Sequence, residues 1–241
     1  MDFIPIKTRK FTPPRDQGKL FELLDQYLPN LKNKDVVVIT SKIVSIHQGR
    51  FVPAKSMKQK LQLIKQEADG YLPDHPHGLT LKDITLTPYA GIDRTNSNNH
   101  YVLWPDKPPL AAKAIYKYLR RRHRLKHLGV IIIDSFCLPL RWGHMGISIG
   151  YWGFHPNHSY NGTRDIFGHT IIQGNSNYVD ALAAISGVIM GEGNEQTPLL
   201  LIRGFPRLKF TVKDTLAELK TAAADDLYAP LLRVLQPAEK L

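Results

Sequence analysis

The stretch from residue 129 to residue 150, GVIIIDSFCLPLRWGHMGISIG, most constrains what this chain can fold into. Residues 130–133 form a continuous run of β-branched side chains, which predicts a strand buried on both faces. Asp134 and Ser135 follow at once, and a strand that ends in an acid can present a metal ligand or a reacting group on a rigid support. An Asp at this place would equally serve as an ordinary turn residue. These residues alone leave both interpretations open.

Size and composition are those of a globular protein. The 241 residues suffice to bury a core, as one large domain or two small ones. No apolar run approaches the ~20 residues that cross a membrane, and the start, MDFIPIKTRK, lacks the apolar core of a signal peptide. Cys137 is the only cysteine, so an internal disulfide is excluded and a cytoplasmic location is expected.

The chain is strongly basic, with a formal net charge of +11 and a pI of about 9.7. This balance favours an anionic partner, such as a phosphorylated metabolite, a nucleic acid or an anionic surface. Much of the excess lies in residues 113–126, on Lys113, Lys117, Arg120, Arg121, Arg122, Arg124 and Lys126. A solvated helix face explains this run without any ligand. Because the sequence contains no recognised nucleic-acid-binding motif, we do not expect a nucleic-acid partner.

Strand and helix patterns alternate unevenly along the chain, which predicts a mixed α+β fold instead of a doubly wound sheet. The predicted strands are 3–6 (an edge strand containing Pro5), 35–45, 84–86, 102–104, 130–133, 147–154 and 199–202. The predicted helices are 20–28, 57–68, 108–126 and 179–190, followed by a mainly helical tail with helices around 212–219 and 227–235. Loops are expected at 69–80 and 155–170.

Three acids stand at the ends of predicted elements, beside small residues. They are Asp93 after Ala-Gly-Ile, Asp134 after the apolar strand, and Glu192 between two glycines. Hard oxygen ligands of this kind suit Mg²⁺ or Mn²⁺ and not zinc. Such ions usually accompany phosphates, whose charge they neutralise. Spacing alone does not show that the three converge, so three unrelated turn acids remain the alternative.

Other candidate groups are weaker. His123 and His127 are four residues apart, as zinc ligands can be, but the surrounding cations favour a solvated helix face. An Arg such as Arg141 could lower the pKa of Cys137, yet no His or Asn can be tied to this thiol, which favours a buried structural role. The glycine-rich phosphate-binding motifs GxxxxGK[ST] and GxGxxG are absent.

Six stretches taken together resemble the coenzyme F420-0:γ-glutamyl ligase family, in order and over residues 3–205. They are VVVITSKIVSIHQGR (36–50), AGIDRTN (90–96), GVIIIDSF (129–136), LRWGHMGISIG (140–150), YNGTRDIFG (160–168) and VIMGEG (188–193). Within the family, the chain is most similar to the bacterial group labelled folate-metabolism γ-glutamate ligases. The resemblance implies an α+β catalytic domain at 1–205, with mixed sheets flanked by helices, and a helical tail at 206–241 packed on the same domain.

The resemblance also implies an activity, which is amide-bond formation between L-glutamate and an anionic carboxylate acceptor through an acyl phosphate, driven by GTP. The acceptor would be the coenzyme F420 precursor or a folate-like molecule, and the enzyme would be a homodimer. Two Mg²⁺ or Mn²⁺ ions would be held by Asp93, Asp134, Ser135 and Glu192, with Asp93 and Asp134 as the catalytic acids. The implied nucleotide contacts are Ser41, Lys42, Asn96, Met190, Gly191, Glu192, Gly193 and Asn194.

Some positions depart from the family pattern while leaving the implied metal ligands intact. Ile46 replaces a Lys that would face phosphate, and His47 or Arg50 are the candidates to supply that charge instead. The other departures are Cys137 and Leu138 in place of Gly-Arg, His169 in place of Arg, and Ala181 in place of an acid. They leave open a rival interpretation, a non-catalytic nucleotide- or nucleic-acid-binding protein that uses the basic helix 113–126.

Overall fold

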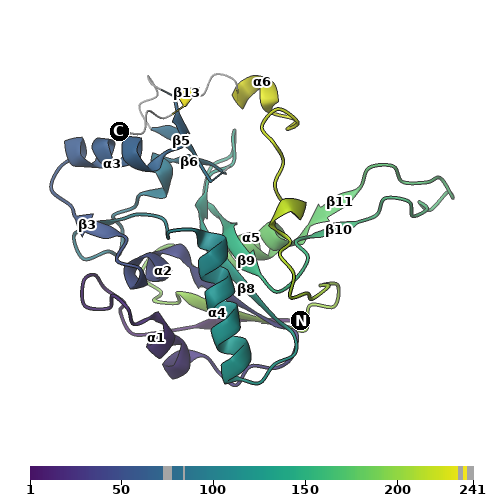
Figure 1. Ribbon diagram of the computed structural model, residues 1–241, viewed down its shortest axis with the longest axis horizontal. Helices are drawn as coiled ribbons and strands as arrows, with labels where there is room; N and C mark the ends of the chain where they lie inside the picture. The colour runs from purple at the N-terminus through teal and green to yellow at the C-terminus, as the bar shows by residue number, and fades with distance from the viewer. Residues whose placement is uncertain (73–77, 84, 233–235, 238–241) are drawn as a thin grey trace.

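A central five-stranded sheet organises the computed structural model of this protein (Figure 1). The structure describes residues 1–72, 78–83, 85–232 and 236–237. In spatial order the strands are β1 (Asp2–Ile6), β12 (Leu199–Arg203), β2 (Asp35–Thr40), β8 (Leu128–Phe136) and β9 (Met145–Trp152). Only β2 and β8 run parallel, and the other neighbours are antiparallel. The predicted edge strand at 3–6 is confirmed, with Pro5 at the sheet margin where a missing N–H costs least.

Helices cover both faces of this sheet. On one face lie α1 (Leu20–Tyr27), α2 (Ser41–His47) and α4 (Pro108–Arg122), and on the other lies α5 (Tyr178–Met190). Alternate strand residues enter the two cores, so that Val37 packs with the first helices and Val38 packs with α5. A sheet covered on both faces needs apolar residues at every strand position. This explains the uninterrupted apolar runs, and the predicted mixed α+β fold is confirmed.

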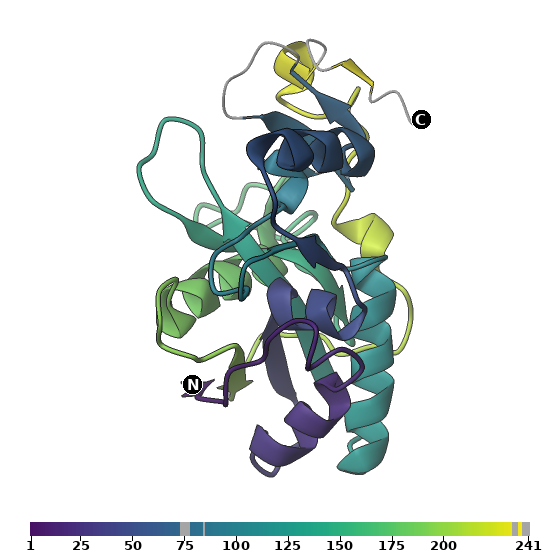
Figure 2. The same cartoon turned by 90° about the vertical axis from the view of Figure 1, so that its left-hand side faces the viewer.

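A smaller lobe sits at one end of the molecule (Figure 2). It contains α3 (Met57–Glu67) and a second sheet of β13 (Gln236–Pro237), β4 (Gly70–Tyr71), β5 (Leu79–Lys82) and β6 (Thr85–Pro88). Its own core is made of Ile64, Ala68, Ala90, Ile92, Tyr101 and Leu103. The two-stranded pair of β3 (Phe51–Pro53) and β7 (His100–Val102) connects this lobe with the central sheet.

An arm projects from the molecule beside α5 (Figure 1). It is the hairpin of β10 (Asn157–Ser159) and β11 (Asn175–Asn177), whose intervening segment exposes Ile166, Phe167 and Ile172. The predicted loop at 155–170 is therefore wrong at residues 157–159, which form β10. No helix in the part of the chain that the structure describes is long and apolar enough to cross a membrane.

The largest correction concerns residues 35–45, predicted as one strand. The strand ends at Thr40, and α2 begins at Ser41. In α2, Ile43, Val44 and Ile46 are all buried, and burial against the first core outweighs the modest helix propensity of β-branched residues. The change from strand to helix was not predicted, because the strand repeat of two residues and the helix repeat of 3.6 residues both place the apolar residues of this segment in the core.

Other boundaries differ from the predictions as well, and β7 and β9 each lie two residues earlier in the chain than predicted. Helix α4 ends at Arg122, because Arg124 adopts a left-handed backbone with φ 55°. The predicted loop at 69–80 contains β4 and the start of β5, and its residues 73–77 lie outside the described residues. The described part of the tail is mostly irregular, and its regular elements are a 3-10 turn, η2 (Leu216–Glu218), the short helix α6 (Ala229–Leu232) and strand β13. Residues 233–235 of the predicted second tail helix are not described.

Candidate active site

Asp134 stands near the end of β8, on the sheet face covered by α2. The Ser41 hydroxyl, on the first residue of α2, donates to Asp134 Oδ1 over 3.0 Å. The indole N–H of Trp104 donates to Asp134 Oδ2. Burial raises the pKa of Asp134 to about 6, although both donors and the nearby Lys42 charge act in the opposite direction. The strand thus holds a carboxylate that is costly to ionise, as a cation ligand or a proton carrier would be.

Trp104 reaches this carboxylate because Gly91 leaves space for its ring. Gly91 has φ +70°, and a Cβ built there would lie 2.0 Å from Trp104 Nε1. Only glycine fits a position that is both left-handed and in contact with an indole. Trp104 was not among the predicted site residues. The only sequence signal for its role was the Gly of the AGID motif, which indicates that another group packs closely against the backbone but does not identify that group.

Asp93 follows that glycine and belongs to the smaller lobe. Lys42 Nζ lies 2.6 Å from Asp93 Oδ2, and the backbone N–H of Thr95 donates to Oδ1 over 2.9 Å. The hydroxyl of Thr95 also donates to Oδ2. Burial would raise the pKa of Asp93, but Lys42 and Thr95 hold it below its usual value. Asp93 is therefore easier to ionise in the folded protein than a free Asp, whereas Asp134 is harder to ionise.

A second cation lies close to Asp93. Lys60 of α3 places its ammonium 3.9 Å from the centre of the Tyr89 ring. Burial lowers the pKa of Lys60, and the charge of Asp93 partly offsets that effect. Lys60 was not predicted as a site residue, because the sequence of an ordinary surface helix does not distinguish one Lys from another.

Glu192 lies in the loop after α5 and meets the strand from the opposite side of the sheet. The Ser135 hydroxyl lies 2.7 Å from Glu192 Oε2 and 2.9 Å from Oε1. Successive strand residues point to opposite faces, so Asp134 and Ser135 present oxygens on both sides of the strand end. Gly191 ends α5 with φ +81°, which turns the chain toward Ser135. The side-chain amide of Asn96 then donates to the Gly193 carbonyl over 2.7 Å.

These contacts close into a ring of residues from four separate segments. Each link is either a peptide bond along the chain, a side-chain hydrogen bond or an ion pair. In order, the ring runs through Asp134, Ser41, Lys42, Asp93, Thr95, Asn96, Gly193, Glu192 and Ser135. The alternative of three unrelated turn acids does not explain such closure.

The donor chemistry of the ring fits a hard cation. Its carboxylates are those of Asp93, Asp134 and Glu192, with hydroxyls from Ser41, Thr95 and Ser135, and these are ligand types that Mg²⁺ and Mn²⁺ prefer. Within the described residues, no three His, Cys, Asp or Glu side chains already converge as a metal cage. Each acid is instead paired with a hydroxyl or with the ammonium of Lys42.

The remaining predicted nucleotide contacts occupy different environments. The Met190 side chain is buried in the core beside α5, which leaves only its backbone for a ligand, and the Thr197 hydroxyl already donates to its carbonyl. Gly193 donates its N–H to Glu195 over 2.8 Å. Asn194 is exposed.

The departures from the family pattern also have defined places. Ile46 is fully buried. The proposed substitutes for the missing Lys are engaged elsewhere: Arg50 binds Glu67 over 2.5 Å, and the His47 ring accepts the N–H of Leu20. Cys137 is exposed, which corrects the prediction of a buried thiol. It begins the loop between β8 and β9, which places its side chain outside both cores.

The other departures lie away from the ring. Leu138 is exposed in the same loop as Cys137, and Ala181 is exposed on α5. His169 lies in the projecting arm, 3.4 Å from Asp165. None of them interrupts a contact of the ring.

Comparison with known proteins decides the family. The sequence profile described as F420-0:Gamma-glutamyl ligase matches residues 18–204, which is most of the chain. The chain belongs to the F420-0:γ-glutamyl ligase family. Its activity class is therefore that of an enzyme, a glutamate ligase that forms amide bonds. This family assignment favours the enzyme over the non-catalytic rival.

Individual relatives agree with the family profile, and each carries the name coenzyme F420:L-glutamate ligase. The protein of Methanococcus maripaludis strain DSM 14266 is 30% identical, over 78% of this chain and 82% of its own length. The protein of Halobacterium salinarum strain R1 is 28% identical, over 80% of this chain and 84% of its own length. The protein of Methanocaldococcus jannaschii is 26% identical, over 78% of this chain and 82% of its own length. The resemblance inferred from the six stretches is confirmed.

Proposed function

We propose that this γ-glutamyl ligase is driven by GTP and depends on Mg²⁺ or Mn²⁺. The observation that carries the proposal is the closed ring, in which β8, α2, the 93–96 turn and the loop after α5 bring together carboxylates, hydroxyls and the ammonium of Lys42. Phosphoryl transfer needs positioning and charge neutralisation more than covalent help from the protein. The ring supplies groups suited to both tasks.

The reaction would proceed in two steps. A carboxylate oxygen of the acceptor attacks the γ-phosphorus of GTP, the bond to the β-phosphate oxygen breaks, and GDP leaves with an acyl phosphate formed. The amine of L-glutamate then attacks the acyl carbon, phosphate leaves with the bonding electrons, and the amine loses a proton. Binding both reactants side by side makes each attack effectively intramolecular.

Each part of the ring has a proposed task. Lys42 would contact a phosphate as a point charge, while Ser41 and Asn96 donate hydrogen bonds to the nucleotide. The loop at 190–194 would border the same nucleotide. Asp93, Asp134, Ser135 and Glu192 would hold two ions, which when bound neutralise the charge of the transferring phosphoryl group.

The acceptor is proposed by analogy and charge. The names of the relatives favour the coenzyme F420 precursor, and a folate-like carboxylate is the second candidate. The formal net charge of +11 fits an anionic acceptor of either kind. A homodimer, proposed from the family resemblance, can be checked by analytical ultracentrifugation.

Calorimetric titration with GTP and then ATP, with and without Mn²⁺, tests the nucleotide site. We expect metal-dependent binding of GTP that disappears in Asp134→Ala and survives in Asp225→Ala, a matched change at an exposed acid of the tail. Mass spectrometry of reactions with L-glutamate and each acceptor would then identify the amide product. Absence of nucleotide binding under every metal condition would contradict the proposal.

A further inference from the structure

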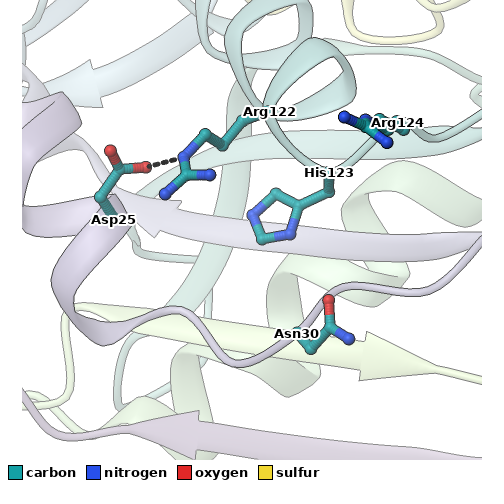
Figure 3. Close-up of a pocket in the computed structure, with 5 residues that line it drawn as sticks. All are labelled: Asp25, Asn30, Arg122, His123 and Arg124. Carbon is teal, nitrogen blue, oxygen red and sulfur yellow. Dashed lines mark ion pairs between the residues drawn. The ribbon is translucent and has the colours of Figure 1, made fainter.

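A pocket of about 320 Å³ opens at the C-terminal end of α4, away from the ring of site residues. It is lined by Asp25, Asn30, Arg122, His123 and Arg124 (Figure 3). The chain continues from this helix end into the start of β8 at Leu128, whereas Asp134 and Ser135 stand toward the other end of that strand. The pocket and the proposed ligase site therefore lie at opposite ends of the central sheet.

The charges in the pocket do not balance. Asp25 is its only carboxylate, and both of its oxygens are engaged: Oδ2 accepts from the Tyr118 hydroxyl over 2.7 Å, and Oδ1 lies 3.4 Å from Arg122 Nε. Within the described residues, the terminal nitrogens of Arg122 and the whole guanidinium of Arg124 have no hydrogen-bond or ion-pair partner. One paired and one unpaired guanidinium thus border a recess that contains no free acid.

The helix end does not cancel this positive charge. The carbonyls of the last turn, on Leu119, Arg120 and Arg121, accept the backbone N–H groups of His123, Leu125 and Arg124. Capping of this kind satisfies the partial negative charge of a helix C-terminus. The pocket therefore presents guanidinium N–H groups rather than bare carbonyls.

We propose that this pocket is a second anion site, which binds the phosphate group of a small ligand through Arg122 and Arg124. A guanidinium matches two phosphate oxygens in one plane, and charge-assisted hydrogen bonds of this kind are strong. The neighbouring cations Lys117, Arg121 and Lys126, which have no acidic partner within the described residues, raise the local concentration of anions. A recess lined by five residues suits a small ligand better than a polymer, which would follow the helix surface.

Titration of the full-length protein with inorganic phosphate tests this site. Binding is monitored by the broadening of the ³¹P line, in a low-chloride buffer with EDTA. We expect saturable binding that weakens about tenfold in Arg124→Gln, because one charge-assisted contact is lost. Arg121→Gln is the matched control, since it removes the same charge one turn away and outside the pocket lining. The phosphate affinity of Arg121→Gln should stay within about twofold of that of the wild type. Arg124 has no partner to lose in the free protein, and a thermal melt verifies that both variants fold.

Two outcomes would overturn the proposal. Equal weakening in both variants, or no saturation in the wild type, would mean a diffuse basic surface and no site. Binding of a single-stranded oligonucleotide with a steep salt dependence, without phosphate binding, would assign the surface to nucleic acid. GTP turnover is measured in parallel and should be equal in wild type and Arg124→Gln, so failure of the proposed ligase function leaves the phosphate result interpretable.

Discussion

The two halves of the candidate site treat the same chemical group in opposite ways. Asp134 stands on a buried strand of the central sheet, where enclosure raises its pKa to about 6. Asp93 stands in a turn of the smaller lobe, where Lys42 and Thr95 hold its pKa below the usual value despite burial. The strand holds Asp134 rigidly but removes it from water, whereas the turn provides Asp93 with hydrogen-bond donors and a nearby cation. A site that combines the strand and the turn can hold negative charge that neither region alone would stabilise.

The largest expected effect follows from removing the charge on the strand side. Asp134→Asn keeps the shape of the side chain, since its amide oxygen can accept from Trp104 and its NH2 can donate to the Ser41 hydroxyl, yet it removes the charge of a proposed metal ligand. We expect GTP-dependent amide formation to fall by about 10²–10³-fold, the scale of losing one charge-stabilising group. Single-turnover assays measure this, with Asp225→Asn as the control. Activity within a few-fold of the wild type would show that the strand side does not carry the chemistry.

The next effect tests the contact through which the smaller lobe supports the strand side. Gly91→Ala should lower the free energy of unfolding by about 2–3 kcal/mol, because its Cβ meets the Trp104 indole at a left-handed position. Gly162→Ala has a similar φ of +80° with no atom within 4 Å of the added Cβ, so it isolates the backbone cost. Urea denaturation compares the two. Equal losses would mean that the indole is free to move away.

The pH dependence of stability sharpens the contrast between the carboxylates. The folded-state pKa of Asp134, about 6, lies above its ordinary value of 3.8, so the folded protein binds a proton that the unfolded chain releases. Stability from this group is therefore full below pH 4 and declines as the pH rises toward 6. Asp134→Asn should be more stable than the wild type at pH 7.5 by about 2 kcal/mol, and the gain should shrink toward pH 4. Urea midpoints without divalent metal measure this, and a pH-independent difference would contradict it.

The smallest effect has the opposite sign. Asp93 has a lowered pKa, so its stabilising contribution is present above the ordinary value of 3.8 and is lost as the pH falls through the folded-state value. Its side chain is 47% exposed, and its pairing with Lys42 is correspondingly screened. Asp93→Asn should destabilise the protein at pH 7.5 by less than about 1 kcal/mol. Stabilisation by this variant would show that the two halves do not differ.

The sequence by itself determined the fold class, most of the elements and the segments that form the site. Apolar runs at 36–39 and 130–133 predicted buried strands because a sheet covered on both faces admits nothing else. Motif contexts around Asp93, Asp134 and Glu192 selected acids that the structure does bring into one ring. Local pattern and motif context suffice where a segment's environment is set by its own residues.

Only the tertiary structure decided what each of these groups touches. The start of α2 places Ser41 on Asp134 and Lys42 on Asp93, and this helix was predicted as strand because both periods bury the same residues. Trp104 lies 30 residues before Asp134, and its role depends on space left by Gly91. Contacts and pKa values arise from packing between distant segments, which no local pattern encodes. The sequence therefore indicated the site residues, and packing decided their contacts and the directions of their pKa shifts.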